Sequence, residues 1–280
     1  MATLHYPNFD SDEPIVKLVC HETAPLKWLN VYRLRLGANT CEYQFNTGER
    51  EWVLDILGGR CTVNIKAGSQ SATFPEIGGR SNVFEGKPTM VYIPMDASVS
   101  IYAETETFDS LLVSAPAENK HPPALMCPDE AHTRSVGKDN WRRTVHTSVG
   151  EHIKADRLIV GETFNPPGNW SSSPPHKHDQ YDDQAGDIGE IPMEEVYFYL
   201  TDPPQGFGLQ HVYTGPDDSE SLNETYAVKS GDVVVLPKGY HPVVAAPGYQ
   251  LYYFWALAGE VRKYGAWSDD PLHAWIKDSQ

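Results

Sequence analysis

The sequence predicts an all-β protein built from two homologous antiparallel β-sandwich or barrel domains of the jelly-roll type. Short segments rich in Val, Ile, Tyr and Phe recur, with Gly, Pro, Asn and Asp between them, as in strands joined by turns. Long helical periodicity is largely missing, so helix is expected only in short pieces such as 267–277. The predicted strands include 62–66, 89–93, 99–103, 110–114, 195–200, 207–213, 232–236 and 250–257.

A faint internal repeat supports the two-domain prediction. Two segments each run from a glycine through an apolar strand, a proline and a short turn into a second apolar strand. Within them Ser98 falls opposite His241, and a second match places Glu51 opposite Glu195. The two segments with the shared rhythm are 86–103 and 231–246.

The repeat suggests three parts along the chain. Residues 1–115 are expected to form an N-terminal domain without metal ligands, and residues 151–280 a C-terminal metal-binding domain. The polar, proline-containing stretch 116–150 is expected to be the linker between them.

Composition narrows the range of partners and compartments. The 280 residues carry a net charge of −16 without a basic stripe, so neither nucleic acid nor an anionic membrane is an expected partner. No apolar run approaches a membrane span, and the acidic N-terminus does not look like a signal peptide. Four scattered cysteines without a CxxC pair suggest reduced thiols and a cytoplasmic protein. These cysteines are Cys20, Cys41, Cys61 and Cys127.

Three fragments of the second half offer a metal site. In a strand, alternate side chains share a face, so His176 and His178 can point the same way. Glu195 and His241 add a carboxylate and a third imidazole. Such a ligand set suits Zn, Fe, Mn, Co or Ni. The fragments are PPHKHD (174–179), MEEVYFY (193–199) and GDVVVLPKGYHPV (231–243).

Each fragment alone is a weak signal, because histidines and glutamates are common at turns and strand ends. Strand alternation places Glu195, Tyr197 and Tyr199 on one face, where they would line a pocket if the apolar face packs inward. The competing ligand Glu194 would then point the other way. The order of the fragments along the chain is what raises the probability that together they form one metal site.

That order, His-x-His, then Glu, then Gly-x5-Pro-x-Gly-x-His, resembles the double motif of the cupins. Several phrases more narrowly resemble the 5-deoxy-glucuronate isomerase family, which is a bicupin related to the 4-deoxy-threo-5-hexosulose-uronate isomerases. The resemblance covers nearly the whole chain. The phrases include PGNWSSSPPHKHD (167–179), EEVYFY (194–199), PPQGFGLQHVYT (203–214), LPKGYHPVVAAPGYQLYY (236–253), DPLHAWI (270–276), LGGRCTV (57–63) and GGRSNVFEG (78–86).

The resemblance implies a metal-dependent aldose–ketose isomerase of inositol catabolism, which converts 5-deoxy-D-glucuronate to 5-dehydro-2-deoxy-D-gluconate. It implies four ligands, His176, His178, Glu195 and His241, for a divalent metal. Zinc is expected because no redox step is needed, with Mn, Fe, Co and Ni as alternatives. Candidates for proton transfer are Glu195, Tyr197, His211, Tyr213 and Tyr253, with Tyr199 a further tyrosine on the same strand.

The chain departs from the family pattern at two positions, where His211 replaces an expected Arg and Trp255 an expected Asn. The substrate carboxylate calls for a cation, and the sequence offers Lys238, Arg80 and Arg262 without choosing among them. Alternative functions are a related keto-uronate isomerase, an Fe(II) cupin oxygenase and a non-catalytic sugar-binding bicupin. The expected partner is a small sugar acid, and a homo-oligomer is compatible with the sequence.

Overall fold

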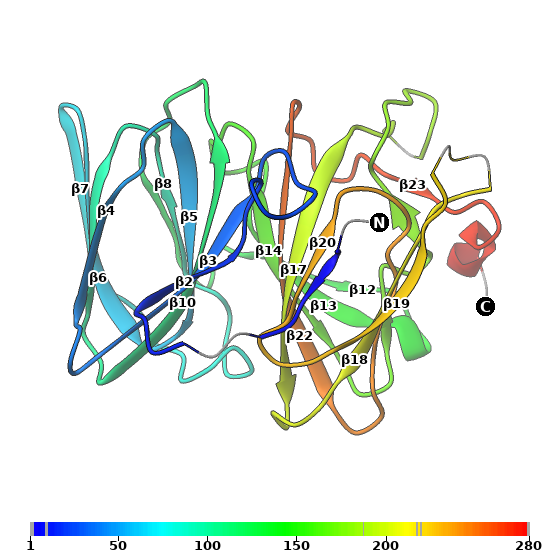
Figure 1. The fold of residues 1–280 in the computed structure, drawn as a ribbon, viewed down its shortest axis with the longest axis horizontal. Helices are drawn as coiled ribbons and strands as arrows, with labels where there is room; N and C mark the ends of the chain where they lie inside the picture. The colour runs from blue at the N-terminus through cyan, green and yellow to red at the C-terminus, as the bar shows by residue number, and fades with distance from the viewer. Residues whose placement is uncertain (1–2, 9–10, 187, 217, 219, 279–280) are drawn as a thin grey trace.

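A computed structural model of the chain describes residues 3–8, 11–186, 188–216, 218 and 220–278. It shows two β domains side by side, the N-terminal one in blue to green and the C-terminal one in green to red (Figure 1). The all-β prediction is confirmed. Neither of the short helical segments that the structure describes has the length and apolar character needed to cross a membrane.

The first domain packs a six-stranded sheet against a four-stranded sheet, and apolar side chains from both sheets fill the space between them. In sheet order, the larger sheet holds β11 (Ala124–Met126), β8 (Met90–Ile93), β5 (Arg50–Gly58), β10 (Thr107–Pro116), β3 (Asn30–Gly37) and β2 (Ile15–Val19). The smaller sheet holds β4 (Glu42–Asn46), β9 (Ser98–Ala103), β6 (Arg60–Ala67) and β7 (Gln70–Gly78).

The second domain is built in the same way, with a seven-stranded and a four-stranded sheet. The larger sheet holds β1 (His5–Tyr6), β20 (Val233–Leu236), β17 (Met193–Asp202), β22 (Gln250–Gly259), β14 (Ile159–Asn165), β13 (Arg143–Val149) and β12 (His132–Val136). The smaller sheet holds β15 (Trp170–Ser171), β21 (Val243–Ala245), β18 (Gly208–Tyr213) and β19 (Asn223–Val228). A two-stranded ribbon pairs β16 (His176–Lys177) with β23 (Ser268–Asp269), and the 3₁₀ helices are η1 (Asp139–Trp141) and η2 (Ala274–Asp278).

The strand orders show that the chain is an internal duplication. The order β8-β5-β10-β3-β2 of the first domain matches β20-β17-β22-β14-β13 of the second. The order β4-β9-β6-β7 likewise matches β15-β21-β18-β19. The predicted pair of homologous β domains is therefore confirmed.

The two repeats exchange their leading strands. Strand β1 precedes the first domain in sequence but pairs with β20 of the second domain, as its dark blue colour shows in Figure 1. Strand β11 precedes the second domain but pairs with β8 of the first. Each sheet is therefore completed by a strand from the other repeat.

Strand register corrects one detail of the predicted repeat. Trp52 pairs with Ile93, and Glu195 pairs with Leu236, each partner lying just before the matching proline of its repeat. Trp52 therefore stands opposite Glu195, so the expected match with Glu51 was wrong by one residue. The error arose because two adjacent glutamates at 194–195 fit the pattern equally well.

Trp52 holds in the first domain the position that Glu195 holds in the second. Its ring stacks on Tyr32, with centroids 5.4 Å apart, and contacts the ring of Phe45 at 5.0 Å. Aromatic side chains thus occupy the place where the second domain carries a carboxylate.

Two expected segments differ from the structure. Residues 116–150, expected as a linker, carry β11, β12, η1 and β13. The strand character of β13 was hidden because its buried residues include Thr, His and Ser. The helix expected over 267–277 is reduced to the five-residue η2, since Ser268–Asp269 pair with β16.

Candidate metal centre and active site

Three of the four predicted ligands converge at one point inside the second domain. His178 follows β16, Glu195 lies in β17, and His241 lies in the turn between β20 and β21. One ligand atom from each lies within 4.8 Å of the others. Glu195 Oε2 is 3.2 Å from His178 Nε2 and 3.4 Å from His241 Nε2. All three side chains are buried, with exposed fractions of 5% or less.

Backbone carbonyls fix the orientation of both imidazoles. The Nδ1 atom of His178 donates to the carbonyl of Met193 at 2.7 Å, and Nδ1 of His241 donates to that of Gly239 at 2.9 Å. Because a carbonyl only accepts, each Nδ1 carries a proton, and in the neutral imidazole each Nε2 then keeps its lone pair. The buried Nε2 of His241 has no hydrogen-bond partner. An orphaned lone pair beside a carboxylate fits a divalent metal.

Burial keeps His241 in the ligating form. Desolvation lowers the pKa of His241 to about 4, although the Glu195 carboxylate opposes the shift. For His178, burial lowers the pKa, but the hydrogen bond and charge of Glu195 outweigh this and leave it raised. Neutral imidazole is the form that binds metals, and a pKa of about 4 keeps His241 in that form at neutral pH.

The fourth predicted ligand, His176, lies beside this cluster rather than in it. Its ring centroid is 4.9 Å from that of His241 and 6.4 Å from that of His178. The ring stacks on Trp267 at 5.1 Å. Burial and the two neighbouring imidazoles lower the pKa of His176 well below its usual value. His176 is therefore a neutral imidazole at the edge of the candidate metal centre.

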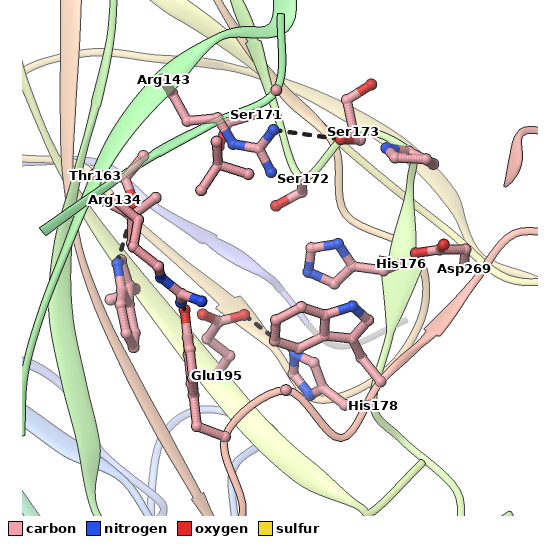
Figure 2. A pocket seen from close by; sticks show the side chains of 18 of the residues that line it. Arg134, Arg143, Thr163, Ser171, Ser172, Ser173, His176, His178, Glu195 and Asp269 are labelled. Atoms are coloured by element: carbon pink, nitrogen blue, oxygen red, sulfur yellow. Dashed lines mark hydrogen bonds and ion pairs between the residues drawn. The ribbon is translucent and has the colours of Figure 1, made fainter. Parts of the chain in front are cut away.

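The cluster lies at one wall of a cavity of about 560 Å³. Figure 2 shows His176, His178 and Glu195 pointing into it, with Ser171, Ser172 and Arg143 on the opposite side. The aromatic side chains of the wall are Trp141, Tyr197, Tyr253, Trp255, Tyr264 and Trp267.

Two predicted catalytic tyrosines face the cavity as paired hydroxyls. Tyr253 shares a short hydrogen bond with Ser171, and the Tyr197 hydroxyl lies 3.3 Å from Ser172 Oγ. Burial raises the pKa of Tyr253, and burial together with the charge of Glu195 raises that of Tyr197. Both phenols are therefore neutral at pH 7 and can donate a proton to an oxygen of a bound substrate.

The other predicted catalytic residues lie outside the cavity wall. His211 Nε2 is 2.8 Å from Asn223 Oδ1, and its ring stacks on Tyr213 at 4.7 Å. The Tyr213 hydroxyl donates to Asp270 Oδ2 at 2.6 Å. Strand alternation explains the placement, because in β18 the two side chains point away from the buried Gln210 and Val212.

None of the three cations proposed from the sequence lines the cavity. Lys238 pairs with Glu220 at 2.5 Å, and Arg80 forms a buried ion pair with Glu162. Arg262 donates to backbone carbonyls. Among the described residues, the cations that do line the cavity are Arg134, Arg143 and Lys277, of which Arg143 is buried. The sequence did not point to Arg134 or Arg143 because both lie in the expected linker.

The departure at Trp255 lies in the cavity itself. Its indole Nε1 donates to Thr163 Oγ1 at 3.1 Å, and its ring stacks on Tyr264 with an interplanar angle of 13°. A Cβ at Gly161 would come within 2.3 Å of the Trp255 ring. The glycine therefore makes room for the indole, which forms a flat apolar part of the wall.

A family model described as KduI/IolB family matches residues 4–276. A 5-deoxy-glucuronate isomerase of Geobacillus thermodenitrificans is 37% identical and matches 99% of this chain and 95% of its own length. One from Bacillus velezensis is 41% identical over 84% of this chain and 82% of its own length.

Solved structures show the same architecture. An IolB-like protein of Salmonella typhimurium LT2 superposes with a TM-score of 0.87 at 33% identity, covering 99% of this chain and 100% of that one. The oxalate decarboxylase of Lactobacillus farciminis gives 0.67 at 12% identity over 100% and 91% of the two chains. At that identity the second likeness shows the fold alone, and it agrees with the predicted bicupin.

Proposed function

Because this chain belongs to the KduI/IolB family, we propose that it is a metal-dependent 5-deoxy-glucuronate isomerase. The observation that carries the metal dependence is the buried cluster of His178, Glu195 and His241, with an unpartnered Nε2, at the wall of a cavity. The cavity of about 560 Å³ is large enough for a six-carbon sugar acid. A cytoplasmic location and the oligomeric state stay predictions.

The proposed reaction moves two protons and leaves the carbon chain intact. The aldose loses the proton of C2 and gains one at C1, while the hydroxyl proton of O2 is exchanged for one on O1. The product is the 2-keto isomer, 5-dehydro-2-deoxy-D-gluconate, and no electrons leave the substrate. After C2 has lost its proton and before C1 has gained one, negative charge is spread over O1 and O2 and must be stabilised.

The residues that would hold the metal are His178, Glu195 and His241, with His176 beside them as a further imidazole. A divalent cation bound there would supply Lewis-acid stabilisation of the developing negative charge. We propose zinc, because the donor set suits a borderline ion and the reaction needs no redox change.

The residues that would move protons line the cavity. The hydroxyls of Tyr197 and Tyr253, each beside a serine hydroxyl, would donate to the substrate oxygens. Among the described residues, Glu195 is the buried carboxylate that lines the cavity, and we assign it the transfer between C2 and C1.

The test is to incubate the purified protein with 5-deoxy-glucuronate and follow the aldehyde proton by NMR. We expect the signal to disappear, with solvent deuterium entering C1 in deuterated water and without oxygen uptake. A chelator should stop the reaction, and zinc should restore it. An unchanged aldehyde signal with metal-loaded protein would contradict the isomerase, and oxygen uptake would favour an oxygenase.

A further inference from the structure

Arg143 differs from the other buried arginines of the described residues in lacking an acidic partner. The three buried arginines, Arg80, Arg143 and Arg157, are each 8% exposed. Arg80 is paired with Glu162, and Arg157 with Glu118. No carboxylate of the described residues lies within ion-pair distance of Arg143. A buried guanidinium without a counter-charge is costly, so an anion supplied from outside would stabilise it.

The hydrogen bonds of Arg143 leave much of its guanidinium unused. Its Nη1 donates to the backbone carbonyls of Trp141 at 3.2 Å and Ser173 at 3.3 Å. Its Nε is buried without any partner. The carbonyl contacts hold the planar group in place, and the remaining N–H groups are available to a ligand.

The surroundings of Arg143 describe an anion subsite. The guanidinium lies on the cavity wall near the Ser171 and Ser172 hydroxyls, across from Glu195 and His178 (Figure 2). Hydroxyl groups can add hydrogen bonds to the same anion. The acidic lining residues are Glu195 in the metal cluster and Asp269, which is paired with Lys277 at 2.5 Å.

The other arginine of the cavity is less suited to this task. Arg134 is exposed, donates to the Tyr264 hydroxyl at 3.0 Å and lies over the Tyr264 ring at 5.3 Å. Both guanidinium groups lie over an aromatic ring, that of Arg143 being Trp141 at 5.9 Å, but the charge of Arg134 is also exposed to water. An exposed cation contributes little to binding, whereas a buried and pre-oriented guanidinium contributes more.

We propose that Arg143 binds the carboxylate of the sugar acid and so orients its carbonyl end toward His178, Glu195 and His241. The proposal rests on the proposed function for the identity of the substrate. It assigns to one residue the selection of sugar acids over neutral sugars. The orientation follows because the carboxylate and the aldehyde are at opposite ends of the six-carbon chain.

The experiment compares Arg143→Gln and Arg143→Lys with wild type on two substrates. One is 5-deoxy-glucuronate, and the other is its neutral analogue with a hydroxymethyl group in place of the carboxylate. For Arg143→Gln we expect kcat/KM for the acid to fall about 10- to 100-fold, mainly through KM, while the analogue is unaffected. The kcat/KM of Arg143→Lys for the acid should lie between those of wild type and Arg143→Gln, because lysine keeps the positive charge but lacks the planar pair of N–H donors of a guanidinium.

The matched control is Arg142→Gln, which removes the same charge from the exposed neighbouring residue. It should leave kcat/KM for both substrates unchanged. An equal loss on acid and analogue in Arg143→Gln would show a merely structural role and overturn the proposal. If Arg143→Gln does not fold, the same comparison made with Arg143→Lys decides.

A binding measurement separates this proposal from the isomerase proposal. Calorimetry of the zinc-loaded protein with D-glucuronate and D-glucose needs no turnover. We expect wild type to bind the acid about 10- to 100-fold more tightly than glucose, and Arg143→Gln to lose this preference. Retention of the preference in Arg143→Gln would exclude Arg143 as the anion site, whatever the outcome of the NMR assay.

Discussion

Glu51 and Glu194 perform the same structural task in opposite domains. The Glu51 carboxylate accepts the backbone N–H groups of residues 156–158, which lead into β14 of the second domain, each at 2.7 Å. Glu194 accepts those of residues 27–29, which lead into β3 of the first domain, at 2.6 to 2.7 Å. The two carboxylates therefore join the domains by six charge-assisted hydrogen bonds.

Replacing Glu194 by Ala should lower the free energy of unfolding by about 2–4 kcal/mol, because three amides lose their acceptor in a buried position. Urea denaturation measures the change. Glu260→Ala is the control, since Glu260 forms only an exposed ion pair with Lys27. It should cost less than about 1 kcal/mol. Equal effects of the two substitutions would contradict the structural role of Glu194.

A second interdomain cluster allows a comparison of two buried acids. Arg80 binds both carboxylate oxygens of Glu162, at 2.5 and 3.0 Å, and lies 3.5 Å from Asp55. Burial, and then the charge of Glu162, raises the pKa of Asp55 well above its usual value. Asp55→Asn should therefore cost less than about 1 kcal/mol, whereas Glu162→Gln, which removes the bidentate partner of Arg80 and leaves it only Asp55 at 3.5 Å, should cost about 3 kcal/mol. Urea denaturation at pH 7 distinguishes the two.

The same shift predicts a pH dependence. Because the folded protein holds a proton on Asp55 that the unfolded chain releases more readily, this group stabilises the fold at low pH. The contribution is lost as the pH rises from the unfolded pKa of about 4 through the raised folded value. The difference in stability between wild type and Asp55→Asn should thus shift in favour of the variant on going upward from pH 4. A constant difference would show that Asp55 does not titrate differently on folding.

His178→Ala should lose both bound metal and turnover, because it removes a buried ligand of the proposed centre, the other ring nitrogen of which is already fixed by Met193. We expect at least about a 100-fold drop in activity, together with loss of metal by elemental analysis. His132→Ala, at an exposed histidine of β12, is the control and should keep both. Retained metal and turnover in His178→Ala would rule out the proposed centre.

Tyr253→Phe should lower kcat about 10- to 100-fold with little change in KM or metal content, since it removes a hydroxyl that the proposed reaction uses as a donor to the substrate but not as a metal ligand. Steady-state kinetics by the NMR assay measure the two parameters. Tyr226→Phe, in β19 away from the cavity wall, is the control and should behave as wild type. A change in KM alone would indicate a binding role for Tyr253.

Much of the fold was predictable because strand alternation and turn residues are local signals. The strand that carries Glu195 and the turn that carries His241 were found in this way, and the side chains that they hold meet His178 as expected. Strand β13 was missed because its buried side chains are largely polar, and Arg143 was missed with it.

Contacts between segments that are distant in the chain could not be predicted, because no local pattern in the sequence marks them. The sequence shows that His176 and His178 alternate, but not that His176 stacks on Trp267 from the C-terminal segment. Likewise, nothing near Arg80 in the sequence reveals that Glu162 in the other repeat neutralises it. Such pairings depend on tertiary packing, which periodicity does not encode.

The exchange of β1 and β11 has a consequence for whether either repeat can stand alone. If one repeat were present without the other, β20 or β8 would lack its partner strand and would expose unpaired backbone N–H and C=O groups at the edge of its sheet. The exchange therefore makes each repeat depend on the other for a complete sheet.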